Sequence, residues 1–297
     1  LQKFFAGRLE LARAQWTHLE SWRRSGVGHA PALVERIGGM LARADTLDSI
    51  CPLDDEDLRG WHAVITGGVL LHLSPFGFDE GMRGRYAFLQ DDTTLCAEAI
   101  ARLHIVVEAT ALHHEPRVLL LDDRPSEILG LGLASALGWP TCPLAEHPQA
   151  PGLIVSYDIS ALEPQTLGLG VHHPGQALWS HVTPWTQHLP IAADVTTLLA
   201  QFIYSPWEGH LHVEEQTGEL IQGPADDRGV ETLAAELSCL PLPEVAPKES
   251  RQLVEMCQAL EALGHPHGAG WCRAKQGVPL QRPQGWRGGP VKSNLFR

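Results

Sequence analysis

The sequence has few lysines and asparagines, and it has no apolar run long enough to cross a bilayer. Only four of the 22 basic residues are Lys, and Asn294 is the only asparagine. Because Lys and Asn codons are A-rich, this bias indicates a GC-rich bacterial genome. The longest mainly apolar stretch, residues 62–73, is shorter than a membrane-spanning helix, and charges interrupt the first residues where a signal peptide would be apolar. We therefore expect a soluble, cytoplasmic bacterial protein.

Paired cysteines and the common catalytic motifs are also absent from the sequence. The six cysteines form no C-x-x-C pair and fit no zinc-binding spacing, which favours reduced and mostly buried thiols. No G-x-x-x-x-G-K loop, G-x-S-x-G elbow or H-E-x-x-H string occurs, and no glycine fingerprint precedes a predicted helix. These absences leave the catalytic residues unknown and enzymatic activity uncertain, and they predict no cofactor.

The carboxyl-terminal end of the chain has a net positive charge, whereas the residues before it are acidic overall. The net charge is −13, but no acid follows Glu261, so residues 1–261 carry −19 and the remainder carries +6. An acidic body is a poor partner for nucleic acid or an anionic membrane. We expect the basic tail, residues 264–297, to lie on acidic surface of its own chain or of a second copy. Nucleic acid is a partner only if the tail is free to bind it.

The most informative stretch is Arg117–Pro140, which reads as a buried strand followed by a helix. Four consecutive apolar residues, 118–121, are followed by two acids, and a helical pattern then ends near Gly138. A second apolar run, residues 153–157, also ends in an acid, Asp158. Continuous apolar runs are typical of parallel strands that are buried on both faces. The pattern predicts two adjacent parallel strands in a small Rossmann-like sheet, with the helix as their crossover.

The pattern of the whole chain predicts an α/β protein with four regions. We expect a mainly helical region 1–115, an α/β layer 116–205, a hairpin with helices 206–263, and an extended tail 264–297. Further expectations are helices over 4–24, 31–44, 92–115 and 192–204, an irregular segment over 160–190, a hairpin over 210–222, and two helices over 227–237 and 248–264. The region after 206 is thus mixed α+β.

The acids after the two strands form the candidate ligand site. Ligands in parallel sheets bind at the carboxyl ends of the strands, where Asp122, Asp123 and Asp158 are expected. Acid pairs at that edge bind Mg²⁺ or a ribose hydroxyl. The predicted site also includes Arg124 and Ser126 at the start of the following helix. The simpler interpretation is that the acids cap this helix or pair with Arg124.

The string VLLLDD followed by a helix resembles the opening of a bacterial response-regulator receiver domain. In that family two acids hold Mg²⁺ and a third aspartate ends a later strand, as Asp158 does here. Only 34 residues separate Asp123 from Asp158, which leaves little room for the strand and helix that the family has between them. We therefore do not assign the chain to that family.

Histidines offer a second, weaker interpretation. The chain has sixteen, and His210 and His212 would share one face of a strand with Glu214. A solvent-facing strand explains that spacing equally well, so no metal ligand is assigned.

Two functional classes remain open. The first is a non-catalytic subunit or scaffold that contacts a protein partner or a second copy. It rests on the acidic body, the basic tail and the missing catalytic motifs. The alternative is a small-ligand or nucleotide-binding enzyme that uses the strand-end acids with Mg²⁺.

Overall fold

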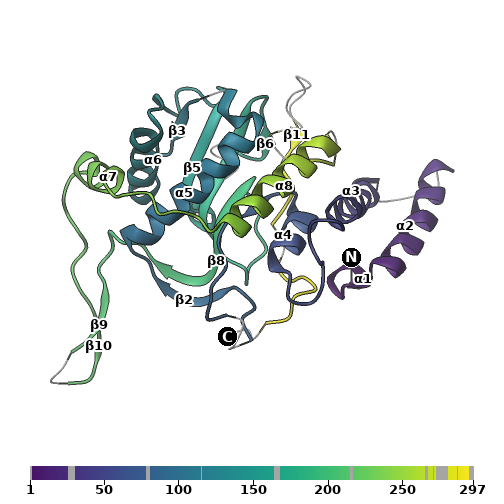
Figure 1. Ribbon diagram of the computed structural model, residues 1–297, viewed down its shortest axis with the longest axis horizontal. Helices are drawn as coiled ribbons and strands as arrows, with labels where there is room; N and C mark the ends of the chain where they lie inside the picture. The colour runs from purple at the N-terminus through teal and green to yellow at the C-terminus, as the bar shows by residue number, and fades with distance from the viewer. Residues whose placement is uncertain are drawn as a thin grey trace.

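The computed structural model describes residues 2–25, 31–77, 81–114, 116–163, 168–214, 217–264, 267–269, 271, 280–285 and 287–293. Helices at the amino terminus precede a central, mostly parallel sheet, so the predicted α/β class is confirmed (Figure 1). Within these residues, none of the helices is both long enough and apolar enough to cross a membrane.

Four helices form the amino-terminal part of the chain. They are α1 (Gln2–Phe5), α2 (Leu9–Arg24), α3 (Pro31–Leu47) and α4 (Leu58–Thr66). Asp57 begins α4 by accepting a hydrogen bond from the Gly60 N–H at 2.8 Å. Gly67 ends the helix in the left-handed region, at a φ of 77°, where a Cβ would add strain. The chain enters the sheet directly after this turn.

The sheet has seven strands, and every pairing between them is parallel. Its order is β1-β8-β7-β5-β3-β4, with β2 also paired to β8. The strands are β1 (Val69–Leu70), β2 (Tyr86–Gln90), β3 (Val118–Leu120), β4 (Thr141–Pro143), β5 (Gly152–Asp158), β7 (Gln176–Thr183) and β8 (Val195–Tyr204). The predicted neighbours β3 and β5 pair directly, with Val118 opposite Leu153.

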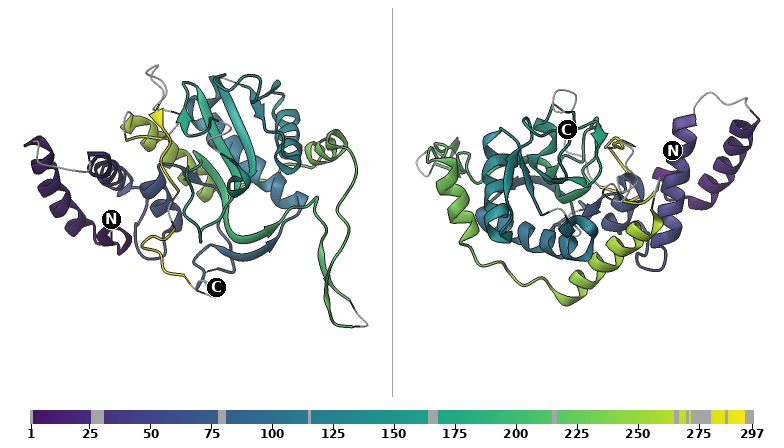
Figure 2. Two further views of the ribbon diagram at one scale, coloured as in Figure 1. Left: turned by 180° about the vertical axis from the view of Figure 1, so that it is seen from behind. Right: turned by 90° about the horizontal axis from the view of Figure 1, so that it is seen from above.

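The strands are buried on both faces because their side chains alternate between two cores. Val118 and Val155 belong to the larger core, while Leu119 and Ile154 belong to a smaller one. Helices cover the first face (Figure 2). The core on the second face also contains apolar side chains from outside the strands: Leu144, Ile159, Leu169, Leu189, Ile191 and Ala193. The continuous apolar runs therefore predicted this burial correctly.

Two helices after the first strands are fixed by aspartate caps. In α5 (Thr93–Ala109) the Asp92 carboxylate accepts the Leu95 N–H at 2.8 Å, and in α6 (Arg124–Leu137) Asp123 accepts the Ser126 N–H at 3.0 Å. Short 3₁₀ helices follow at Ala111–His114 and Ile159–Ala161. Two further helices, α7 (Val230–Ser238) and α8 (Pro247–Leu263), pack on α6 and α5 respectively.

Two expectations about the central strands are wrong. Residues 195–204 form β8 rather than a helix, and the segment predicted to be irregular contains β7. Val195, Thr196 and Thr197 are β-branched and buried, which suits a strand at the centre of a sheet. Neither segment has a simple apolar period, because polar side chains such as Ser180 and His181 are buried among the apolar ones.

Beyond the sheet, the chain forms a projecting arm and then returns to the body. Strands β9 (Leu211–Val213) and β10 (Leu220–Gln222) pair as the predicted hairpin, which extends away from the body (Figure 1). The described part of the tail returns to the body, where β11 (Leu280–Gln281) pairs with β6 (Val171–His172) in a separate, antiparallel two-stranded sheet. Of the two tryptophans in the tail, Trp271 is buried, and Trp286 lies outside the described residues.

Candidate functional site

The predicted acids lie at the carboxyl ends of their strands, where Asp123 and Asp158 each accept hydrogen bonds through one carboxylate oxygen. Asp122 is exposed and Asp123 caps α6. Asp158 accepts hydrogen bonds from the Ser160 N–H and hydroxyl, both at 2.8 Å. Burial raises the pKa of Asp158 above its usual value, and the nearby charge of Asp123 adds to this effect. The two carboxylates therefore interact electrostatically across the sheet edge.

The other two predicted site residues also hold the fold together. Arg124 donates to the carbonyls of Asp226 and Arg228, at 2.6 and 2.9 Å. The Ser126 hydroxyl accepts the Tyr157 N–H at 2.8 Å and so ties α6 to β5. Ligand binding by these acids stays a prediction, and helix and turn capping already explain the positions of the Asp123 and Asp158 side chains.

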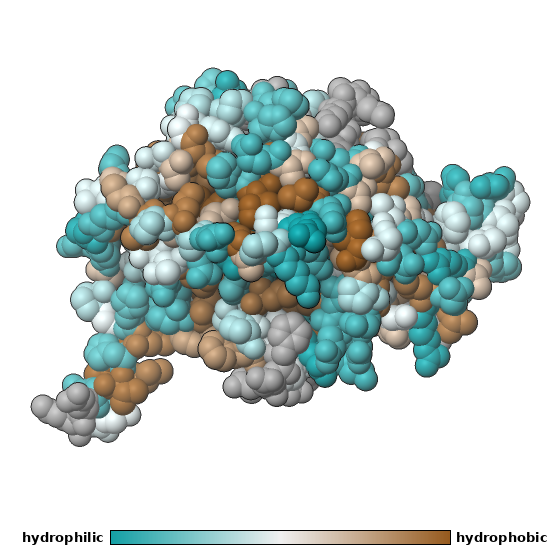
Figure 3. All heavy atoms as spheres, viewed as in Figure 1, coloured by the Kyte–Doolittle hydropathy of each residue, from teal (hydrophilic) through white to brown (hydrophobic). Residues whose placement is uncertain are grey.

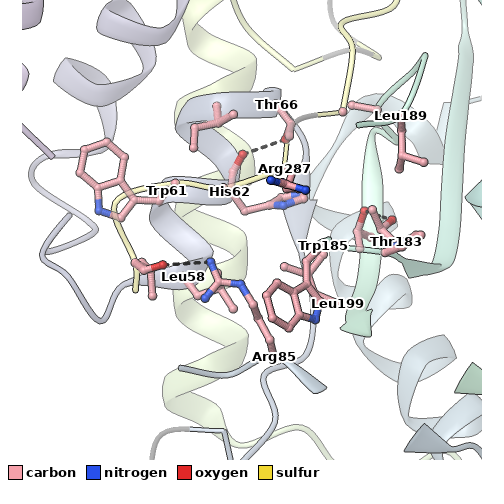
Figure 4. Close-up of a pocket in the computed structure, with 18 of the residues that line it drawn as sticks. Leu58, Trp61, His62, Thr66, Arg85, Thr183, Trp185, Leu189, Leu199 and Arg287 are labelled. Atoms are coloured by element: carbon pink, nitrogen blue, oxygen red, sulfur yellow. Dashed lines mark hydrogen bonds between the residues drawn. The ribbon is translucent and has the colours of Figure 1, made fainter. Parts of the chain in front are cut away.

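A separate cavity of about 280 Å³ lies beside β8, and sequence reasoning did not find it (Figure 4). Its walls come from α4, from residues 183–199 around the ends of β7 and β8, and from the tail segment 285–293. Leu58, Ile65, Trp185 and Leu199 make its lining largely apolar. Such a lining with a few polar groups is typical of a small-molecule site, and the volume is near the lower end of the usual range.

The charge of this cavity is its most unusual property. Its described lining residues include Arg85, Arg287 and Lys292 but no aspartate or glutamate. Arg85 is only 6% exposed, and it donates to the Met82 and Val291 carbonyls at 3.5 and 3.3 Å. Its guanidinium lies 5.4 Å from the ring centroid of Trp185. Burial lowers the pKa of Arg85 to about 10, and in the described part of the chain it forms no ion pair.

The lining of the cavity also contains a histidine. The Nε2 atom of His62 is buried and has no hydrogen-bond partner among the described residues. Burial, together with the charge of Arg85, lowers the pKa of His62 to about 4. The ring is therefore neutral near pH 7 and presents one unpaired polar atom in a cavity with cationic walls.

A second cluster is entirely buried between the sheet and α5. The Asp91 Oδ2 atom accepts hydrogen bonds from the Tyr157 hydroxyl at 2.6 Å and the Cys96 thiol at 3.5 Å. His181 Nε2 lies 3.0 Å from the same oxygen and 4.0 Å from the Cys96 sulfur. Asp91, Cys96 and His181 are each 0% exposed. Among the residues that the structure places, they are the only group of three possible metal ligands whose donor atoms lie within 4.8 Å of one another. Neither the strand-end acids nor His210, His212 and Glu214 are gathered this closely.

This cluster does not have the geometry of a nucleophilic triad. In a triad, the acid and the nucleophile bind opposite nitrogens of the histidine ring. Here Asp91 and Cys96 both approach Nε2 of His181, and Nδ1 has no partner among the described residues. Burial raises the pKa of Cys96 well above its usual value, and the charge of Asp91 adds to the shift. Cys96 is therefore a thiol rather than an activated thiolate.

Neither site could be assembled from sequence alone, although one signal was present. Asp91 precedes Asp92, which begins the helix predicted over 92–115, and its own position at the end of a strand indicates the sheet edge. His181 lies 90 residues later in a strand that the sequence did not reveal. A search of protein-family models, curated proteins and solved structures finds no match to this chain.

Proposed function

We propose that the protein binds a small anionic ligand with an apolar part in the cavity between α4, β8 and the tail. The observation that carries this proposal is Arg85, a buried guanidinium in a cavity with no carboxylate in its described lining. A buried charge without a partner costs several kcal/mol, and proteins usually pair it. A bound carboxylate or phosphate would supply that partner.

The composition of the protein strengthens this argument. The chain carries 35 acidic and 22 basic side chains, so an acid-free lining is not what its average composition would give. Arg287 and Lys292 are exposed at the rim, where they would attract an anion before it reaches Arg85. The Trp185 ring and the leucines would contact the apolar part of the ligand.

Calorimetric titration with three probes of similar shape tests the proposal. We expect phenyl phosphate to bind, and the neutral benzyl alcohol and the cationic benzylammonium to bind far more weakly. Replacing a rim cation, Arg287→Gln or Lys292→Gln, should weaken phenyl phosphate binding about fivefold, because an exposed ion pair contributes at most about 1 kcal/mol. Arg251→Gln is the matched control, because Arg251 is exposed on α8 outside the lining.

Replacement of the buried cation is the stronger test. Arg85→Gln should weaken phenyl phosphate binding about 10-fold to 150-fold, since a hydrogen bond to a charged group contributes about 1.5–3 kcal/mol. Circular dichroism of the variant would establish that it remains folded. Binding of benzylammonium as tight as that of phenyl phosphate would refute an anion site.

A second candidate function is self-association through the projecting arm, which would make the protein a structural subunit. Val213 and Leu220 on the arm are 62% and 65% exposed, and Phe202 at the end of β8 is 62% exposed. Figure 3 shows apolar surface on this arm, away from the body. Exposed apolar groups on a two-stranded arm favour contact with another protein surface, here a second copy.

Light scattering in solution tests this second candidate. A mass larger than that of one chain should fall in the variant Val213→Ser/Leu220→Ser and remain in Leu242→Ser, which changes an exposed leucine away from the arm. A wild-type mass of one chain at all concentrations would refute self-association.

A further inference from the structure

We propose that Asp91, Cys96 and His181 form a buried binding site for one Zn²⁺ ion. The three donor atoms are those that zinc prefers: a carboxylate oxygen, a sulfur and an imidazole nitrogen. This site is separate from the anion cavity, because none of the three residues lines it. The inference is therefore independent of the proposed function.

The distances between the donor atoms fit a single metal ion. The sides of the triangle that they form are 3.0, 3.5 and 4.0 Å. The point equidistant from its three corners lies about 2.1 Å from each, close to the bond lengths of about 2.0–2.3 Å that zinc makes with such ligands. An ion slightly out of that plane would reach all three atoms without movement of the backbone.

The positions of the three ligands are fixed by different elements. Asp91 follows β2 and its N–H donates to the Tyr204 carbonyl at 3.0 Å, while Cys96 lies in the first turn of α5. His181 belongs to β7, and its ring lies between Tyr157 and Trp179, with centroid distances of 5.3 and 6.4 Å. The Tyr157 hydroxyl donates to the Asp91 carboxylate, as residues around a metal site commonly do for a ligand.

The charge of the cluster also favours a cation. Within the described residues, the only ion-pair partner of the Asp91 carboxylate is His181. A divalent ion would compensate this buried carboxylate and a Cys96 thiolate, and the thiol proton would be released to solvent when the ion binds. The metal-free alternative is a hydrogen-bond network in which the tyrosine, the cysteine and the histidine all donate to Asp91.

Cobalt substitution during refolding distinguishes these alternatives. Because the cluster is closed to solvent, the full chain should be unfolded in urea and refolded with one equivalent of Co²⁺ or Zn²⁺. We expect about one metal ion per chain by elemental analysis after gel filtration. With cobalt, we expect the ultraviolet charge-transfer band of a thiolate ligand. Refolding with zinc should also raise the melting temperature relative to refolding with a chelator.

The variants test the ligand assignment. Cys96→Ser should lose the charge-transfer band, and His181→Gln should reduce the metal content by about tenfold or more. Cys142→Ser is the control, because Cys142 is a free cysteine outside the cluster. Wild-type protein that refolds to its native spectrum without retained metal or a thiolate band would overturn the proposal and assign the cluster to the hydrogen-bond network. Loss of the band in Cys142→Ser alone would overturn the assignment of Cys96.

Discussion

Replacing Asp194 with Asn should destabilise the protein more than any surface substitution, because it leaves a buried arginine without its counter-charge. Asp194 is 5% exposed and accepts hydrogen bonds from the Leu178 N–H at 2.8 Å and from His172 at 3.2 Å. It also pairs with Arg282, whose side chain is 0% exposed. The Arg282 charge holds the pKa of Asp194 below its usual value, against the effect of burial.

The size of the loss in stability depends on which partner of the ion pair remains in the core. Removal of one partner of a buried pair typically costs about 3–5 kcal/mol, because the other charge stays buried and uncompensated. Asp194→Asn should approach that range, since Nε and one terminal nitrogen of Arg282 already have no partner among the described residues. Arg282→Met should cost less, about 1–3 kcal/mol, because Asp194 keeps His172 and the Leu178 N–H. The double variant should recover part of the sum of the single losses.

Urea unfolding of the four proteins at pH 7, followed by fluorescence and circular dichroism, measures these free energies. Because the folded-state pKa of Asp194 is lowered, its stabilisation is fully present above the usual aspartate pKa and is lost only as the pH falls below it. The difference between wild type and Asp194→Asn should therefore shrink only in acid. A loss below about 1 kcal/mol for Asp194→Asn, or strictly additive single losses, would refute a buried ion pair between the tail and the sheet.

Two further perturbations test the cavity histidine and the strand-end acids. The pKa of His62 falls from 6.5 to about 4 on folding, so stability should be greatest above pH 6.5 and decline by at most about 3 kcal/mol as the pH falls towards 4. Urea unfolding of His62→Gln should show a weaker decline over that range than wild type or the exposed control His114→Gln, and an unchanged decline would contradict the assignment. Asp123→Ala should cost about 1 kcal/mol through loss of the α6 cap, whereas Asp122→Ala should cost little. A rise in the wild-type melting temperature with millimolar Mg²⁺ that Asp123→Ala abolishes would instead support a metal site at these acids.

Local sequence patterns were sufficient to predict β3, β5 and the start of α5. The runs of apolar residues in β3 and β5 predicted two buried parallel strands, because burial on both faces removes the polar alternation. Asp92 correctly marked the start of α5. The same logic failed for β7 and β8, where buried serine, threonine and histidine interrupt the apolar pattern, and where a β-branched run was mistaken for a helix.

The sequence alone determined the α/β class, the pairing of β3 with β5, the edge on which Asp122, Asp123 and Asp158 lie, and the hairpin. Only the tertiary structure decided which polar groups meet. Asp91 and His181 are 90 residues apart, and Arg282 is 88 residues from Asp194. The cavity likewise joins α4 to tail residues that follow it by more than 200 positions. Sequence periodicity reports how one segment divides its own side chains between core and solvent. Contacts across such separations depend instead on strand order and on how the chain returns over the sheet, so no single segment records them.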